Sequence, residues 1–412
     1  MNNMEEITMK LNEKKYLATD DSVVILNNEE EFTKYLEFRK ENDEWINTFI
    51  NNLACYGVAN LPLFIPGACK DIRIEKDSYK IEVDDIDYEL EANRECIGDT
   101  GLFLVIPYGN KPVAFPTRPL AYTSICQRAE LSCGTMARFD ERQNKLVFPI
   151  EEKAKWLTRA FQLYGDSCKA LYRDGKISAL LSKEYKILPC DELIEVLKSE
   201  LKEVHEKLAF EDAMISHEYL IARYALNDKS IEESLRLKLN DFGSNITKLT
   251  AGVQFSTSDV GLSSVVANVY LVIDGVRVVL SGISMPHKGD SSIEKFKDKL
   301  GEFGLILQES EERIEELGNL DINDVNGVIK VVTEAYPSVF PKAATEQVLS
   351  EVRGAGTGID VFIALNDIIN RHTSNNEVSP TRYLNMAEQV YAMIKLPFDK
   401  IESGEFTFKQ QK

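Results

Sequence analysis

The chain has few histidines and no long apolar run. Its four histidines, His205, His217, His287 and His372, are too far apart in sequence to suggest a metal site. No stretch approaches the roughly 18 consecutive apolar residues that a membrane-spanning helix needs. The opening "MNNMEEITMK" has neither the basic nor the apolar region of a signal peptide. The sequence therefore predicts a cytoplasmic protein without a membrane partner.

Several enzyme fingerprints are also missing. There is no Walker loop, no G-x-S-x-G elbow and no H-E-x-x-H helix. The glycines of "RGAGTGID" (354–358) follow a helical stretch in G-x-G-x-G spacing, which indicates a helix end and a new start rather than a dinucleotide site. "DINDVNG" (321–327) resembles a calcium loop, but its glycine comes one position late and no Glu closes it, so Asp321 or Asp324 is more simply an N-cap. We predict no cofactor.

The cysteines do not form a recognisable framework. Seven of them, an odd number, are scattered through the first half of the chain, which favours reduced thiols over disulfides. Cys126 and Cys133 have no second pair and no histidine nearby. They are better explained as small buried hydrophobes than as zinc ligands, and no metal site is predicted.

The composition is that of a globular protein, with 44% hydrophobic and 28% charged residues, and 412 residues exceed one typical core. Residues 29–57 read as one or two amphipathic helices. Gly109-Asn110, Asp174-Gly175 and Asp274-Gly275 each predict a β-hairpin turn. Further helices are predicted at 117–138, 150–164, 191–208, 291–317, 322–335, 342–353, 358–371 and 380–395.

These patterns predict an α+β fold with a mixed or antiparallel sheet of β-hairpins packed by helices, followed by an all-helical C-terminal unit. We expect three regions. They are an N-terminal helix and β-hairpin region (1–115), a central α+β domain (116–290) and a helical domain (291–412).

The formal charge of −19 repels phosphate backbones, so nucleic-acid binding requires a local basic region. Residues 111–190 provide one, with fourteen Lys or Arg against eight Asp or Glu, a net of +6. Aromatic residues are interleaved, as in grooves that bind single strands. The candidate nucleic-acid-binding residues are Arg128, Arg138, Lys155, Arg159, Lys169, Arg173, Lys176, Trp156 and Tyr172.

Two plainer explanations of the same segment remain open. Lys155 and Arg159 fit the solvated face of an amphipathic helix, with the aromatic residues in the core. The basic segment could equally seat the acidic surface of a neighbouring subunit.

One weak enzymatic pattern survives. Asp174 is followed after nine residues by Glu184-Tyr185-Lys186, and metal-dependent nucleases place an Asp and an E-x-K on adjacent strands to hold a divalent ion. Asp174 is, however, already explained by its Asp-Gly turn. Asp174, Glu184 and Lys186 are therefore weak catalytic candidates.

Two segments resemble a phage- and plasmid-related family known as domain of unknown function 932. The resemblance covers about residues 115–375, including "GTGIDVFIALNDIINRHTS" (356–374). In the first segment it is carried by Arg173, Gly175, Ala179, Ser182 and Tyr185. In the second it is carried by Ser258, Asp259, Gly261, Ser264, His287, Lys288 and Gly289. The chain departs from the family at Ser281-Gly282, where many members have a Cys-Asn-Gly-like element.

The resemblance implies a bacterial mobile-element protein, encoded near genes of replication and recombination, without established catalytic residues. We therefore expect a non-enzymatic accessory protein that binds single-stranded DNA or RNA, with homo-oligomerisation left open. The alternative is an acidic module that binds a host, phage or defence protein. A metal-dependent nuclease comes third. The loop with His287 can bear function, although a lone histidine there is more often structural.

Overall fold

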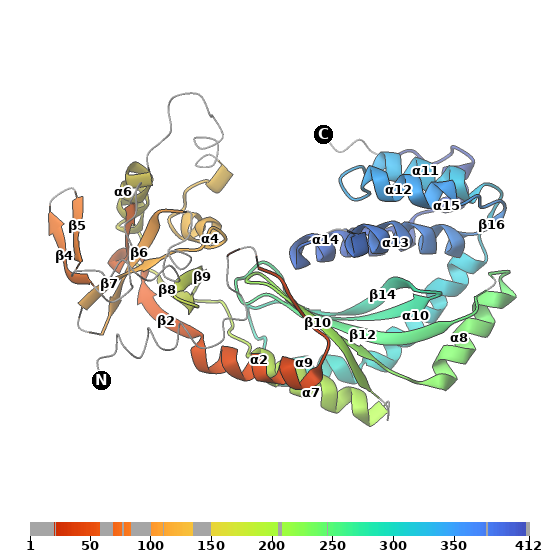
Figure 1. Ribbon diagram of the computed structural model, residues 1–412, viewed down its shortest axis with the longest axis horizontal. Coiled ribbons are helices and arrows are strands. Elements are labelled where there is room, and N and C mark those ends of the chain that lie inside the picture. Colours follow the sequence, from red (N-terminus) through yellow and green to blue (C-terminus); the bar gives the residue numbers. More distant parts are fainter. Residues whose placement is uncertain are drawn as a thin grey trace.

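The computed structural model describes residues 20, 22–57, 69–75, 78–83, 100–109, 111–134, 150–204, 208–244, 246–375 and 378–408. These residues form two lobes that lie side by side (Figure 1). The large lobe has a core that draws on residues between Leu26 and Ile401, and the small lobe has a core between Ile46 and Leu180.

The large lobe is built on an antiparallel sheet with the strand order β1-β10-β11-β12-β13-β14. Its strands are β1 (Val24–Leu26), β10 (Ala209–Ile215), β11 (Leu220–Ala225), β12 (Leu249–Thr257), β13 (Val265–Ile273) and β14 (Val276–Met285). β13 and β14 are joined by Asp274 and Gly275, both at positive φ (47° and 90°). The expected Asp-Gly hairpin is therefore confirmed.

Helices cover both faces of this sheet (Figure 1). One face is apolar and receives α2 (Glu29–Asn42), α7 (Cys190–Val204) and α9 (Ile293–Gly301), with Phe255 of β12 against Phe296 of α9. The opposite face carries buried polar groups. There Arg223 donates to Gln254 and Asp212, and its guanidinium lies over the ring of Tyr383 from α14 (Pro380–Ala392).

The remaining elements of the large lobe are mostly helical. They are α8 (Lys229–Asp241), α10 (Phe303–Gly318), α11 (Val325–Ala335), α12 (Lys342–Ser350), α13 (Gly358–Asn375) and α15 (Phe398–Glu402), with a short ladder of β15 (Asp321–Ile322) and β16 (Gly356–Thr357). Asp324 caps α11 by accepting from the Gly327 amide, which explains the calcium-like sequence as an N-cap.

The small lobe contains two three-stranded antiparallel sheets joined by a bridge between Thr117 and Ile177. Their strands are β2 (Glu44–Phe49), β8 (Ser167–Arg173), β9 (Lys176–Ser182), β3 (Ala54–Gly57), β6 (Leu102–Tyr108) and β7 (Lys111–Pro116). α4 (Ala121–Arg128) packs on β9 and α6 (Ile150–Phe161) on β3, and β4 (Cys69–Glu75) pairs with β5 (Ser78–Val83). The Asp174-Gly175 turn between β8 and β9 is confirmed.

The α+β class and the antiparallel sheets are confirmed, but several details of the sequence analysis differ from the structure. The expected helix over 117–138 begins at Ala121 and ends at Arg128. The expected helix over 29–57 ends at Asn42, and β2 and β3 follow it. The lobes also do not follow boundaries at residues 116 and 290. The chain enters the small lobe after α2 and leaves it after β9, so the small lobe is an insertion within the large one.

Within the described ranges, no helix combines the length and the apolar character needed to span a lipid bilayer.

Candidate functional site at the junction of the lobes

The two segments that carry the family resemblance meet at the junction of the lobes. Arg173, at the end of β8, donates to Asp259 after β12 at 2.8 Å. The Tyr185 hydroxyl donates to the Ser258 carbonyl at 3.1 Å, and the Lys186 amide donates to the His287 carbonyl at 2.8 Å. Segments 73 to 101 residues apart therefore form one contact surface.

A buried network of charges, which we call the ion-pair cluster, ties this surface together. It consists of Arg39, Arg118, Arg173 and Lys176 with Asp20, Asp43, Asp174 and Asp259. Arg39 holds both oxygens of Asp174, at 2.9 and 3.0 Å. Lys176 holds both oxygens of Asp20, each at 3.0 Å. The four cations and four carboxylates cancel, so the cluster is neutral.

Arg173 is the centre of the cluster. Its side chain bonds Asp43 and Asp259, which come from the ends of α2 and β12. Burial alone would lower the pKa of Arg173, but the two carboxylates outweigh burial and raise the pKa well above its usual value. This guanidinium therefore stays charged and joins three separate segments of the chain.

The described residues of the predicted nucleic-acid face do not come together on one surface. Arg173 and Lys176 are buried in the ion-pair cluster, and Lys169 donates to the Tyr185 carbonyl at 2.6 Å. Tyr172 packs edge-on against Phe115 in the small-lobe core. The other candidates are placed elsewhere: Lys155, Arg159 and Trp156 are exposed on α6, Arg128 ends α4, and Arg138 lies outside the described residues.

The nuclease-like residues are also separated. Asp174 lies in the turn of the β8–β9 hairpin, whereas Glu184 and Lys186 follow the far end of β9. At about 3.3 Å per strand residue, the two carboxylates are roughly 20 Å apart and cannot share a metal ion. Among the residues that the structure describes, no group of three or more His, Cys, Asp or Glu side chains is placed to hold a metal.

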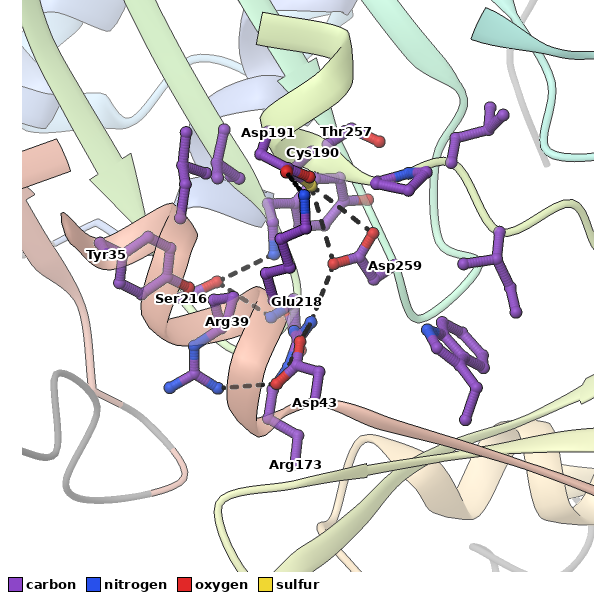
Figure 2. Close-up of a pocket in the computed structure, with 18 residues that line it drawn as sticks. Tyr35, Arg39, Asp43, Arg173, Cys190, Asp191, Ser216, Glu218, Thr257 and Asp259 are labelled. Atoms are coloured by element: carbon purple, nitrogen blue, oxygen red, sulfur yellow. Dashed lines mark hydrogen bonds and ion pairs between the residues drawn. The ribbon is translucent and has the colours of Figure 1, made fainter. Parts of the chain in front are cut away.

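A pocket of about 180 Å³, which we call the interlobe pocket, lies beside the ion-pair cluster (Figure 2). It is lined by α2, the start of α7, the turn between β10 and β11, and the end of β12. Tyr35, Trp45 and Tyr219 supply aromatic surface. Cys190 also lines the pocket, but burial and then Asp259 raise the pKa of its thiol well above its usual value, so it is not a nucleophile at neutral pH.

A second, larger hollow, the interlobe groove, has a volume of about 560 Å³. Four segments line it: the end of α4, residues 180–185 apart from Lys183, the loop 261–264, and residues 286–288. Arg128 is half-buried here, and its Nε is buried without a hydrogen-bond partner. Within the described ranges its guanidinium makes no hydrogen bond or ion pair, unlike the cations of the ion-pair cluster.

His287 is a structural residue of this junction. Its ring is 7% exposed and stacks on Tyr185 with centroids 4.9 Å apart. Nδ1 lies 3.0 Å from the Lys186 carbonyl and must carry the proton, because a carbonyl only accepts. Nε2 then accepts from the Thr257 hydroxyl at 3.1 Å. Burial, the largest influence, lowers the pKa of His287, so the neutral ring is the folded form.

This neutral ring predicts a pH-dependent contribution to stability. Because the folded-state pKa lies below the unfolded value of about 6.5, the unfolded chain binds more protons as the pH falls. The contribution is fully present above about pH 6.5 and is lost as the pH falls through the folded-state pKa. We expect the stability difference between wild type and His287→Asn, measured by urea unfolding, to shrink from about pH 7.5 to about pH 5.

Tyr185→Phe is the matched control for this measurement. It removes the hydroxyl that donates to Ser258 but no group that titrates in this range, because burial raises the Tyr185 pKa further above neutral pH. Its effect should not change with pH. If the stability difference between wild type and His287→Asn is also independent of pH, the assignment of a neutral His287 ring in the folded state is wrong.

Sequence reasoning missed several residues of the site. Arg39, Asp43 and Arg118 were not singled out, and neither was Glu218 of the interlobe pocket. Arg39 and Asp43 pair at a local i,i+4 spacing, but their other hydrogen-bond and ion-pair partners, and those of the Arg118 and Glu218 side chains, are 55 or more residues away, so no local spacing could have revealed the cluster. The part of the sequence that pointed to this site was the pair of segments with the family resemblance, because Arg173 and Asp259 lie in them.

Comparisons with protein-family models, curated proteins and solved structures gave no match. The resemblance to domain of unknown function 932 therefore stays a prediction.

Proposed function

We propose that this chain is a non-enzymatic accessory protein of a bacterial mobile element that binds single-stranded nucleic acid in the interlobe groove. The observation that carries the proposal is Arg128, a half-buried arginine that has no counter-ion among the described residues, in a chain of net charge −19. An acidic chain has many carboxylates, and a partly buried arginine normally pairs with one of them. An arginine without such a pair is therefore available to bind an anionic ligand.

The groove offers chemistry that suits a phosphate backbone. The charged residues of its lining are two cations, Arg128 and Lys288, and one carboxylate, Glu184. Because His287 is neutral, the lining carries a net charge of +1. The hydroxyls of Ser263 and Ser264 can donate to phosphate oxygens. Leu262, 48% exposed, supplies apolar surface for a sugar or base.

The proposal is tested by fluorescence anisotropy of a labelled single-stranded oligonucleotide at about 50 and about 200 mM salt, with and without magnesium. We expect binding that weakens with salt, with the strand intact on a denaturing gel. The double variant Arg128→Met, Lys288→Met should bind at least about tenfold more weakly, because it removes both groove cations. Arg236→Met on α8, far from the groove, should bind like the wild type.

Equal binding by the wild type and the double variant would contradict the proposal that the strand binds in the interlobe groove. Absence of binding at both salt concentrations would favour the second candidate, an acidic module that binds a basic protein surface. One observation supports that candidate: the ion-pair cluster is internally neutral, so the whole charge of −19 belongs to the rest of the chain. Cleavage only with magnesium would instead support a nuclease.

A further inference from the structure

Glu218, in the turn between β10 and β11, lines the interlobe pocket (Figure 2). Its carboxylate accepts a hydrogen bond from the Thr381 hydroxyl of α14. It makes no ion pair with a basic side chain in the described part of the chain. The Ser216 hydroxyl oxygen accepts from the Glu218 and Tyr219 amides, at 3.1 and 3.2 Å, and fixes the turn that presents the carboxylate.

The other charges of the pocket lining are already paired. Asp43 bonds Arg39 at 3.2 Å and Arg173 at 2.9 Å. Asp259 bonds Arg173 at 2.8 Å, and at the rim Asp191 bonds Lys40 at 2.6 Å. Three cations thus face four carboxylates in the lining, and Glu218 is the carboxylate left without a counter-ion.

Aromatic rings add a second feature that favours a cation. Tyr35 and Tyr219 are buried, Trp45 is partly exposed, and all three line the pocket. The negative faces of such rings attract ammonium and guanidinium groups, most strongly where water is excluded. A volume of about 180 Å³ suits the end of a small molecule or one side chain.

We infer that the interlobe pocket binds a primary ammonium or guanidinium group, with Glu218 as its counter-ion and the Tyr35, Trp45 and Tyr219 rings as its walls. This chemistry has two sources, a free aliphatic amine or the Lys or Arg side chain of a peptide. The inference is independent of strand binding, because the pocket and the groove have no lining residue in common.

The two tryptophans of the chain allow a direct test. Trp45 lines the pocket, whereas Trp156 is exposed on α6, so a Trp156→Phe protein reports fluorescence from the pocket alone. We expect 1,4-diaminobutane, agmatine or a short lysine peptide to change this signal saturably. The neutral isostere 1,4-butanediol should not.

Matched variants separate the site from general charge effects. Glu218→Gln, with the same shape and no charge, should weaken amine binding at least about tenfold, whereas Glu37→Gln on the exposed side of α2 should bind normally. Thermal unfolding verifies that each variant is folded. The double variant Arg128→Met, Lys288→Met should keep amine binding. The proposal of strand binding in the groove and the inference of amine binding in the pocket can therefore fail independently.

The outcomes are decisive. Stronger binding of the peptide than of the free amines assigns the pocket to a protein partner, and the reverse order assigns it to a small amine. No saturable signal with any cation, an equal response to the diol, or undiminished binding by a folded Glu218→Gln protein would overturn the inference.

Discussion

Replacing Arg173 with methionine is expected to lower the free energy of unfolding by about 3–5 kcal/mol. The guanidinium is buried and holds Asp43 and Asp259, so its loss leaves Asp259 without its ion-pair partner and Asp43 with Arg39 alone. Removing one partner of a buried pair costs far more than the pair itself contributes, because the remaining charge is still desolvated. Urea unfolding followed by circular dichroism measures the difference.

Arg236→Met is the matched control for this variant. Arg236 pairs with Glu233 on the surface of α8, where solvent screens the interaction, so its loss should leave the unfolding midpoint unchanged. A second check is the triple variant Arg173→Met, Asp43→Asn, Asp259→Asn, which removes the stranded charges and should recover part of the loss. An Arg173→Met protein within about 1 kcal/mol of the wild type would contradict the structural role of the ion-pair cluster.

The Gly252→Ala variant is expected to lose about 2–3 kcal/mol of stability. Gly252 lies opposite Tyr270 in the ladder between β12 and β13, and the tyrosine ring covers it. A Cβ at this position would lie 2.2 Å from Cζ of Tyr270 and 2.7 Å from the carbonyl oxygen of Tyr224. The ring is buried and the carbonyl belongs to the neighbouring strand, so neither can move without disturbing the sheet.

Gly301→Ala serves as the control for the same substitution. A Cβ at Gly301, the last residue of α9, would meet no heavy atom within 4 Å. Alanine has the higher helix propensity, so this variant should be as stable as the wild type or more stable by up to about 1 kcal/mol. Equal stability of the Gly252→Ala and Gly301→Ala proteins would show that the sheet relaxes around the added methyl group.

Local chemistry made much of the fold predictable. The Asp174-Gly175 and Asp274-Gly275 turns were recognisable because few residue pairs adopt two successive positive φ angles. Most helices of the last third were predicted from their apolar period within a few residues of their bounds. The expected helix over 29–57 failed beyond Asn42 because Glu44–Phe49 pair with Ser167–Tyr172, more than a hundred residues away. A periodicity window does not include such a partner.

The candidate site was predictable only in part, for a related reason. Counting charges identified Arg173 and Lys176 as cations but could not reveal that Asp43, Asp259 and Asp20 neutralise them. Whether a cation is free for a ligand depends on contacts across the junction of the lobes. Those contacts are set by tertiary packing rather than by composition.

The insertion of the small lobe has a consequence for synthesis on the ribosome. β1 and α2 emerge before the small lobe, but the strand that pairs with β1 and most of the core around α2 follow the small lobe in the chain. The small lobe, whose core residues all lie between Ile46 and Leu180, can assemble as soon as it emerges, because domains fold as units during translation. β1 must then wait for its partner β10, and the ion-pair cluster is complete only when the end of β12 has emerged with Asp259.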